Sequence, residues 1–284
     1  MIDLHTHTTE SDGRCSPREL VACAALAGVT VLAVTDHDTV AGCEATGGEC
    51  AAARIEFVPG IEVTAVRRGT DVHVLGYFVD VASHALQTFL VEQRRRRVDR
   101  VHQIVDRLKT LGISLDVDAI VRPAVEHPRK SAGRPWIARA LVAEGHAATT
   151  DEAFERWLGR GKPAFVPRLG TPPEEVIVRI HEAGGLASLA HPALIGDDGW
   201  ILTLVRAGLD AIEAYHSKHD IEATERYLAM AAALGVAVSG GSDFHGDQAH
   251  GALTPGSVSL PREAYERLVR LKPDTTTIKP DTTT

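Results

Sequence analysis

The chain has 284 residues, 44% of them hydrophobic, enough to bury the core of one α/β barrel that carries an insertion. The formal charge of −8 argues against a protein that coats long nucleic acid, because such binding needs a basic surface, whereas short phosphorylated substrates remain open. No apolar run reaches about 18 residues and no charged-then-apolar leader is present, so we expect a soluble, cytosolic protein without a membrane partner. The 4 cysteines lack the Cys-x-x-Cys spacing of zinc ribbons and redox motifs, whereas the 14 histidines are unusually many.

The N-terminal part predicts a βαβ unit. Residues 1–7 form a short apolar strand, and Ser16-Pro17-Arg18-Glu19 has the capping-box pattern that begins a helix. This helix continues to about Ala27 and ends at Gly28, and the β-branched run 29–35 is typical of a parallel strand buried on both faces. The helix therefore connects two parallel strands.

The same alternation returns later in the chain. A helix is predicted over 171–183, strands over 186–190, 211–214 and 236–239, and a second helix over 221–234. Residues 57–61 and the alternating segment 71–78 add strands to the first half. These segments predict an α/β barrel built from residues 1–83 and 168–271.

Residues 84–167 lack buried strand runs and are predicted to form a helical cap inserted into the barrel. Residues 86–111 have apolar positions at helical spacing beside the run Arg94-Arg95-Arg96-Arg97. Residues 272–284 repeat a seven-residue unit almost twice with little apolar content, so we predict a disordered tail outside the fold.

Residue types that bind metals follow several predicted strands at their carboxyl ends. The candidates are His5 and His7, Asp36 and His37, Glu62, His191, and Asp243 and His245. Strand ends converge on one face of a parallel barrel, and divalent metals bind imidazole and carboxylate groups. His-x-His alone is weak evidence in a histidine-rich chain, but buried strand ends are poor places for unpaired charges. Five such strands favour two or three ions that share carboxylates and generate hydroxide for phosphoryl transfer.

Several of these residues lie in motifs that together resemble the PHP family, named for polymerase and histidinol phosphatase. The motifs are His5-Thr6-His7, Asp12-Gly13, Thr35-Asp36-His37-Asp38, Gly60-Ile61-Glu62, His73, Ala190-His191-Pro192 and Gly241-Ser242-Asp243-Phe244-His245. The resemblance covers most of the chain except the tail and implies a distorted, TIM-like (β/α)7 barrel. It also implies two or three divalent ions, with manganese expected first and iron or zinc as alternatives. Their implied ligands are His5, His7, Asp12, His37, Glu62, His73, His191, Asp243 and His245.

The cap resembles a narrower subgroup of this family through Gly133-Arg134-Pro135 and Ile137-Ala138-Arg139. That subgroup removes phosphate from nucleoside 3′,5′-bisphosphates and trims short RNAs from the 5′ end, which implies a nucleotide or short oligonucleotide as substrate. Arg134 is predicted to bind a second phosphate, because guanidinium groups match phosphate oxygens. Trp136 stands where the subgroup often has histidine, and its indole is predicted to stack on a base. Arg160 and His216 are further candidates for substrate contacts.

The predicted reaction is hydrolysis of a phosphate monoester by a metal-bound hydroxide, with Asp36, His191 and His245 as catalytic residues and Asp36 as the candidate acid. Three alternatives stay open. Histidinol phosphate phosphatases use a similar centre, metal-dependent amidohydrolases also begin with His-x-His, and a non-catalytic PHP module would bind without turnover. Asp12 and the Asp36-His37 pair do not fit the usual amidohydrolase set, and the retained ligands disfavour a non-catalytic module.

Overall fold

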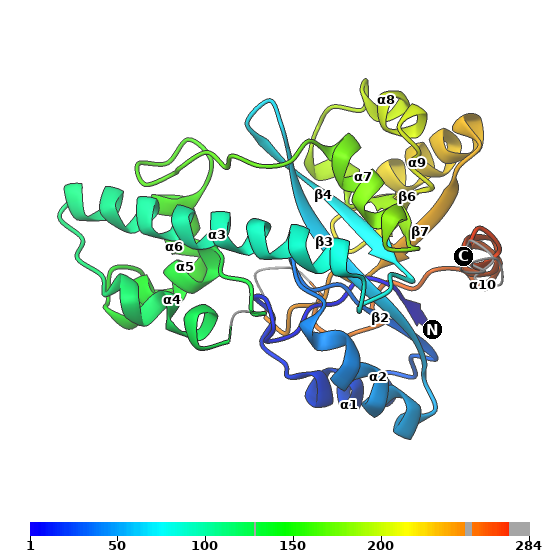
Figure 1. Ribbon diagram of the computed structural model, residues 1–284, viewed down its shortest axis with the longest axis horizontal. Helices are drawn as coiled ribbons and strands as arrows, with labels where there is room; N and C mark the ends of the chain where they lie inside the picture. Colours follow the sequence, from blue (N-terminus) through cyan, green and yellow to red (C-terminus); the bar gives the residue numbers. More distant parts are fainter. Residues whose placement is uncertain (128, 248–251, 273–284) are drawn as a thin grey trace, which may run out of the picture.

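The described part of the chain contains a sheet of seven strands that curves into a nearly closed barrel, as the computed structural model shows (Figure 1). The structure describes residues 1–127, 129–247 and 252–272. Strands that follow one another in sequence are also neighbours in the sheet: β1 (Ile2–Asp3), β2 (Val31–Val34), β3 (Glu56–Arg67), β4 (Thr70–Tyr77), β5 (Leu186–Leu189), β6 (Ala211–His216) and β7 (Ala237–Gly241). The residue that follows β1 lies beside β7, where the Leu4 amide donates to the Gly240 carbonyl at 3.2 Å. This contact brings the two ends of the sheet together. The predicted distorted seven-stranded barrel is confirmed.

The distortion comes from β3 and β4, which form an antiparallel hairpin inside an otherwise parallel sheet. β1, β2 and β3 are parallel, as are β5, β6 and β7, whereas β4 is antiparallel to both β3 and β5. Arg68 and Gly69 form the hairpin turn with φ of 50° and 75°, the left-handed geometry that suits a two-residue connection. The hairpin register pairs Thr64 with His73 and therefore sets His73 diagonally opposite Glu62.

Alternating residues of the short strands face two different apolar cores. Val31 and Ala33 of β2 face the barrel interior, whereas Leu32 and Val34 pack under the surrounding helices. This arrangement explains why the whole strand is apolar. The outer helices are α1 (Pro17–Leu26), α2 (Ala41–Ala53), α7 (Pro173–Glu182), α8 (Ile201–Arg206) and α9 (Ile221–Leu234). At the amino-terminal end of the barrel, α10 (Arg262–Arg270) adds Tyr265 to the interior core.

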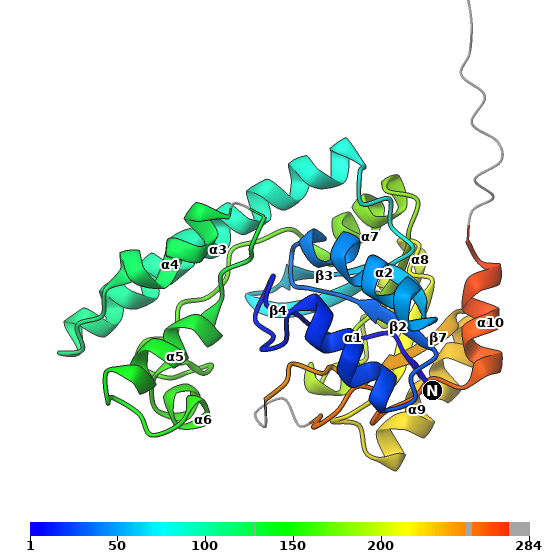
Figure 2. The same ribbon diagram turned by 90° about the horizontal axis from the view of Figure 1, so that it is seen from below.

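A second group of helices extends from one side of the barrel (Figure 2). They are α3 (His84–Thr110), α4 (Val117–Glu126), α5 (Arg134–Ala143), α6 (Thr150–Ala153) and a π-helix (Phe154–Leu158). The first turns of α3 join the barrel core through Leu86 and Leu90, and its later turns form a separate core with Ile137 and Leu141 of α5. These helices fall inside the predicted insertion, 84–167, whose status as a domain stays a prediction.

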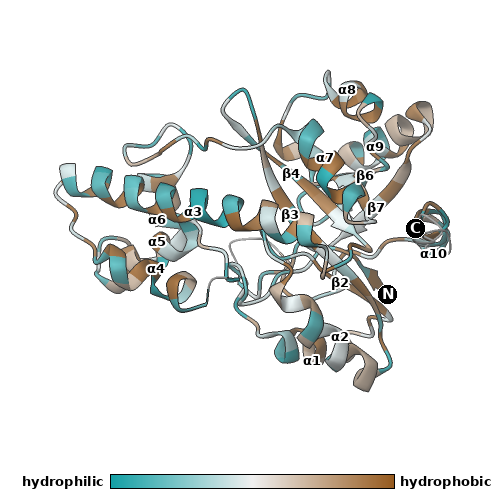
Figure 3. Cartoon of the chain, in the orientation of Figure 1, coloured by the Kyte–Doolittle hydropathy of each residue, from teal (hydrophilic) through white to brown (hydrophobic). Residues whose placement is uncertain are grey.

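Apolar residues gather on the strands and on the helix faces that cover them, as Figure 3 shows. No helix among the described residues combines the length and the hydropathy needed to cross a membrane. The predicted tail, 272–284, lies outside the described residues apart from Lys272.

Candidate metal centre

Ligand-type side chains from the strands meet in one buried cluster at the carboxyl ends of the parallel strands. His5 and His7 follow β1, His37 follows β2, Glu62 lies in β3, His73 lies in β4, His191 follows β5, and Asp243 and His245 follow β7. Asp12 joins them from the loop after β1. All nine are buried except His73 and His191, which are partly exposed. The structure therefore brings the nine predicted metal ligands together.

Glu62 lies at the centre of this cluster, where five histidines surround its two carboxylate oxygens. Oε2 lies 3.4 Å from His5 Nε2, 3.2 Å from His7 Nε2 and 3.1 Å from His37 Nδ1, and Oε1 lies 2.7 Å from His73 Nδ1 and 3.1 Å from His191 Nε2. Because each oxygen faces a different set of nitrogens, both oxygens of Glu62 would be available to hold metal ions, which would supply Lewis acidity there.

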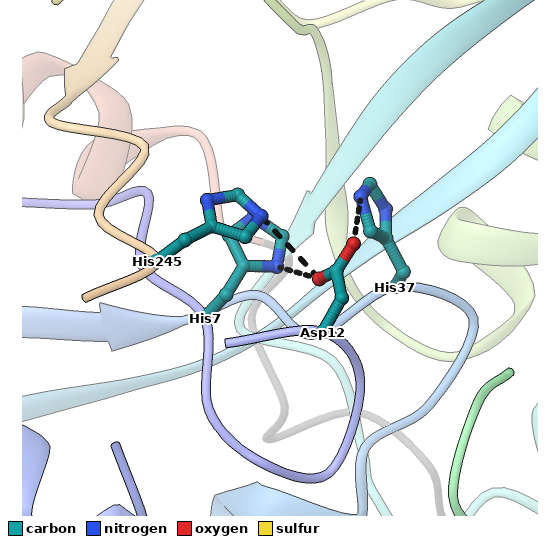
Figure 4. Close-up of side chains that lie close together, drawn as sticks. All are labelled: His7, Asp12, His37 and His245. Atoms are coloured by element: carbon teal, nitrogen blue, oxygen red, sulfur yellow. Dashed lines mark ion pairs between the residues drawn. The ribbon is translucent and has the colours of Figure 1, made fainter. Parts of the chain in front are cut away.

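Asp12 and Asp243 form the other acidic contacts of the cluster. Asp12 lies between three histidines (Figure 4): its Oδ1 is 3.3 Å from His245 Nε2 and 3.8 Å from His7 Nδ1, and its Oδ2 is 3.7 Å from His37 Nε2. Asp243 Oδ1 is 3.4 Å from His5 Nε2, 3.3 Å from His7 Nε2 and 3.4 Å from His245 Nδ1. The histidine His7 thus faces all three carboxylates.

Many of these short contacts do not have hydrogen-bond geometry. Within the described part of the chain, His5 Nε2, both ring nitrogens of His7, His37 Nδ1 and Glu62 Oε2 are buried without a hydrogen-bond partner. Buried polar atoms rarely stay unsatisfied, and here these atoms converge on shared spaces. Four groups of three or four ligand atoms each lie within 4.8 Å of one another, as Asp12 does with His7, His37 and His245. Such mixed imidazole and carboxylate sets fit divalent transition metals, so the residues fit the expected ions.

The electrostatic field of the cluster keeps its acids charged. Burial alone would raise the pKa of Glu62, but His37, His73 and His5 hold that pKa well below its ordinary value. Asp12 and Asp243 behave alike, because neighbouring histidines lower each pKa against the effect of burial.

The histidines of the cluster differ among themselves. Burial disfavours the charged form of His7, yet the nearby carboxylates of Asp243 and Glu62 raise its pKa to about 9. The pKa of His5 is also raised well above its ordinary value, because Glu213, Asp243 and Glu62 outweigh burial. Burial keeps the pKa of His37 well below its ordinary value. A metal cation therefore competes with protons at His5 and His7.

Two of the ligands have unusual backbone geometry. His191 has a φ of 27° and Asp243 a φ of 55°, in the left-handed region that non-glycine residues seldom adopt. Residues held in this region cluster at functional sites, where the surrounding structure offsets the strain. The two positions thus mark the cluster independently of its chemistry.

Residues 3–144 match the model of the PHP domain. This chain belongs to the PHP family. A 5′-3′ exoribonuclease from Salmonella typhimurium is 34% identical over 252 residues, which cover 86% of this chain and 85% of that protein. A 3′,5′-nucleoside bisphosphate phosphatase from Chromobacterium violaceum is 32% identical over 250 residues, which cover 86% of this chain and 87% of that protein.

Other similar proteins act on other phosphate esters. A phosphoribosyl 1,2-cyclic phosphate 1,2-diphosphodiesterase from Eggerthella lenta is 32% identical over 249 residues, which cover 86% of this chain and 94% of that protein. The solved structure of a metal-dependent phosphoesterase from Bifidobacterium adolescentis superposes with a TM-score of 0.86 at 30% identity and covers 96% of both chains. These similarities place the chain among the PHP enzymes that hydrolyse phosphoester bonds.

A hollow of about 230 Å³ lies over the cluster of predicted metal ligands. Seven of the nine ligands line its floor, all except His5 and His7, and its walls include Asp71, Arg97, Arg134, Phe154, Arg168, Leu194 and Lys218. The walls therefore bring basic side chains of the cap and of the segment after it next to the metal ligands. We call this space the metal-site hollow.

The predicted substrate residues occupy different places. Arg134 lines the metal-site hollow, with Nη2 at 3.7 Å from Asp71 Oδ2. Trp136 lines a separate groove of about 640 Å³ behind the first loop, and its indole donates to the Ser11 carbonyl at 3.1 Å. Arg160 is exposed and donates to the Thr70 hydroxyl at 3.0 Å. The geometry thus supports Arg134 and gives Trp136 and Arg160 other contacts.

The predicted acid Asp36 is buried beneath the first loop. Its Oδ1 accepts from the Thr8 amide at 2.8 Å and from the Ser11 hydroxyl at 2.6 Å, and its Oδ2 accepts from the Thr8 hydroxyl at 2.7 Å. These bonds fix the loop that carries Asp12, and Asp36 is not among the described residues that line the metal-site hollow. Its role as an acid stays a prediction, whereas its role in holding the loop follows from the contacts.

His216, a predicted substrate contact, is not among the described residues that line the metal-site hollow and instead lies against the cluster, with Nε2 at 3.3 Å from Asp243 Oδ2. The sequence interpretation missed Glu213, which accepts from His5 Nδ1 at 2.9 Å. A carboxylate inside the apolar strand Ala211–His216 was an available signal, because buried acids need partners. Arg168 was also missed, and its irregular segment offers no periodic pattern that could have located it.

Proposed function

We propose that this PHP enzyme removes phosphate from nucleoside 3′,5′-bisphosphates and, as a further substrate, acts on the 5′ ends of short RNA. The observation that carries the proposal is a surplus of arginine side chains, two buried and two partly exposed, in and directly behind the wall of the metal-site hollow. A substrate with one phosphate places that group over the metal cluster and leaves the arginines unmatched, whereas a second phosphate would fit them.

The surplus of positive charge follows from the ion pairs that these arginines form. Among the described residues, four guanidinium groups share two carboxylates: Arg97 pairs with Asp38, Arg100 and Arg134 approach Asp71, and Arg168 approaches both. Four positive charges minus two negative charges leave an excess of two. Burial and the neighbouring Arg97 lower the pKa of Arg168 to about 10. Its Nε is buried without a hydrogen-bond partner among the described residues, so an anion there would satisfy a donor and relieve repulsion.

The rest of the hollow offers surfaces for the nucleoside. Phe154 of the π-helix and the exposed Leu194 both line it, and the Arg134 guanidinium lies 5.7 Å from the centre of the Phe154 ring. We propose Phe154 in place of Trp136 as the surface on which the base packs, because bases stack on any aromatic face. The volume of about 230 Å³ is small, which implies that the base extends toward solvent.

The same small volume favours one alternative, histidinol phosphate, which is a more compact substrate. That molecule has a single phosphate, however, and leaves the arginine surplus without a function. The charge count therefore ranks the bisphosphate first.

Divalent ions bound by the nine ligands would supply Lewis acidity and lower the pKa of a water molecule. Side chains of the protein have the remaining roles. Glu62, Asp12 and Asp243 hold the ions, and Arg134 and Arg168 orient the second phosphate so that the first lies over the cluster. His191 and His245 line the hollow and remain the candidate catalytic histidines, whereas the position of Asp36 suits it to hold the first loop.

The test is phosphate release by manganese-loaded protein from adenosine 3′,5′-bisphosphate, adenosine 5′-monophosphate, a 5′-phosphorylated short RNA and histidinol phosphate. We expect the bisphosphate to be preferred over the monophosphate. Arg168→Gln should lower kcat/KM for the bisphosphate by about 10- to 100-fold, the value of a charge-assisted hydrogen bond, and leave the monophosphate nearly unchanged. Arg95→Gln, on the exposed face of α3, is the matched control. Preference for histidinol phosphate, or an equal loss on both nucleotides, would contradict the proposal.

A further inference from the structure

We infer that β6 (Ala211–His216) acts as an orienting strand for the metal centre. Its residues Glu213 and His216 bind no metal ion themselves and instead hold the ligands His5, His191 and Asp243 in their binding orientation. The inference rests on the metal cluster and does not depend on which phosphate ester is the substrate.

Glu213 contacts two ligands at once. It is fully buried, its Oε1 lies 2.9 Å from His5 Nδ1, and its Oε2 accepts the backbone N–H of His191 at 2.6 Å. An ionised carboxylate only accepts, so His5 Nδ1 must carry the hydrogen of this bond. Nε2 of His5 then faces the cluster, where it lies 3.4 Å from both Glu62 Oε2 and Asp243 Oδ1, and it is the nitrogen left to bind a metal ion once its own proton is lost. The carboxylate thus selects the tautomer that a metal ligand requires.

His216 is also part of a group that could hold an ion, because its ring nitrogen lies within 4.8 Å of ligand atoms from His5 and Asp243. Its hydrogen bonds give it another role. His216 Nδ1 accepts the backbone N–H of Lys218 at 3.1 Å, so this nitrogen carries the lone pair. In the neutral ring the hydrogen is then on Nε2, which donates to Asp243 Oδ2 at 3.3 Å.

This donation leaves Asp243 Oδ1 directed at the cluster. A metal bound at His216 Nε2 would require the hydrogen on Nδ1, where it would meet the Lys218 N–H head-on. The tautomer therefore assigns His216 as a hydrogen-bond donor to a ligand, comparable to Glu213 as an acceptor from one.

A bulge in β6 explains how both side chains reach the same face. Glu213 pairs with Ser239 and Tyr215 pairs with Gly240, so Ala214 is an extra residue in the strand. In a regular strand, positions three apart point to opposite faces. The inserted residue reverses this alternation and lets Glu213 and His216 both face the cluster, in the way that bulges re-aim side chains beside active sites.

The direct test is nuclear magnetic resonance of the ¹⁵N-histidine-labelled full chain, first metal-free and then loaded with diamagnetic zinc. In the zinc-loaded protein we expect His5 to keep its hydrogen on Nδ1 and to show zinc coordination at Nε2. His216 should keep its hydrogen on Nε2 in both states. A coordination shift at His216 Nε2 on zinc addition would overturn its assignment as a positioning residue.

Zinc and manganese affinity provide a second readout that needs no substrate. Glu213→Gln should weaken metal affinity by about 10- to 100-fold, and His216→Ala should do the same, with partial rescue in His216→Gln, whose amide can donate to Asp243. His219→Gln is the matched control, because its ring lies 5.2 Å from that of His216 and its Nδ1 bonds the Ala214 carbonyl. Unchanged metal affinity in folded Glu213→Gln would refute the inference. If that variant does not fold, the histidine spectra and the His216 series still decide it. Failure of the proposed substrate would leave these metal readouts unaffected.

Discussion

Metal loading at pH 7 should release about two protons per protein molecule, one from His7 and one from His5. The pKa of His7 is raised to about 9, so about 99% of this side chain is protonated at pH 7 in the metal-free protein. His5 has a pKa raised well above its ordinary value and is also charged. Both rings must lose a proton before the nitrogens that face Glu62 can bind metal. The carboxylates add none, because their pKa values are held low.

Isothermal titration of metal-free protein with zinc, in buffers of equal pH but different ionisation enthalpy, counts these protons. The count attributable to His7 should fall as the pH rises through about 9, where this ring is already neutral, and metal affinity should rise over the same range. Protons lost by metal-bound water would not decline in this way, which separates the two sources. His102→Gln on α3 should titrate like the unmodified protein. Absence of proton release at pH 7 would refute the reasoning about the cluster's charge.

Three further predictions concern stability. The folded-state pKa of His7 is raised from 6.5 to about 9, so the stability that protonated His7 contributes is full below pH 6.5 and is lost as the pH rises through 9. The melting temperature of the metal-free protein should therefore fall between these pH values, and a rise would contradict this prediction. Asp36→Ala leaves the buried Thr8 amide and hydroxyl without their acceptor and the Ser11 hydroxyl with only its longer bond to Asp12 Oδ1 at 3.3 Å, so it should cost about 1–3 kcal/mol in urea unfolding. An unchanged midpoint would show that other contacts hold the loop. Asp38→Ala leaves the Arg97 guanidinium buried without its carboxylate and should cost about 3–5 kcal/mol; a loss below about 1 kcal/mol would contradict the buried pair.

The barrel strands and the predicted metal ligands at their ends could be predicted from the sequence pattern, whereas Asp12 and His73 were predicted as ligands from the family resemblance. A buried apolar run followed at once by an ionisable residue indicates a strand that ends at a polar site, because an isolated buried charge is costly. His37, His191 and Asp243 follow this pattern. The antiparallel direction of β4 could not be predicted from the sequence, because the alternation at 71–78 predicts a strand but not its direction. The helix α2 also lacks a clear signal, since Gly47 and Gly48 lower its helix propensity and packing of its Cys43 and Cys50 compensates.

The substrate contacts were predicted less well, because they depend on where the cap places each side chain. Trp136 and Arg134 are two residues apart in α5, yet the first faces the groove behind the first loop and the second faces the metal-site hollow. Residues two apart on a helix point in different directions, so a short motif could not assign both to one pocket. Arg168 contributes from a segment without regular structure, where side-chain direction has no periodicity to reveal it.

The predicted metal ligands and the cap residues of the metal-site hollow are therefore positioned by different parts of the fold. Every predicted metal ligand comes from a barrel strand or the loop after it, where backbone geometry fixes position, whereas Arg134 and Phe154 come from the cap. Because ligands and cap residues sit on separate packed cores, substitutions in the cap should change KM and substrate preference while leaving the metal content intact. We expect the barrel to determine the chemistry and the insertion to determine the selectivity, a division that would let proteins as similar as the exoribonuclease and the cyclic phosphate diphosphodiesterase act on different phosphate esters.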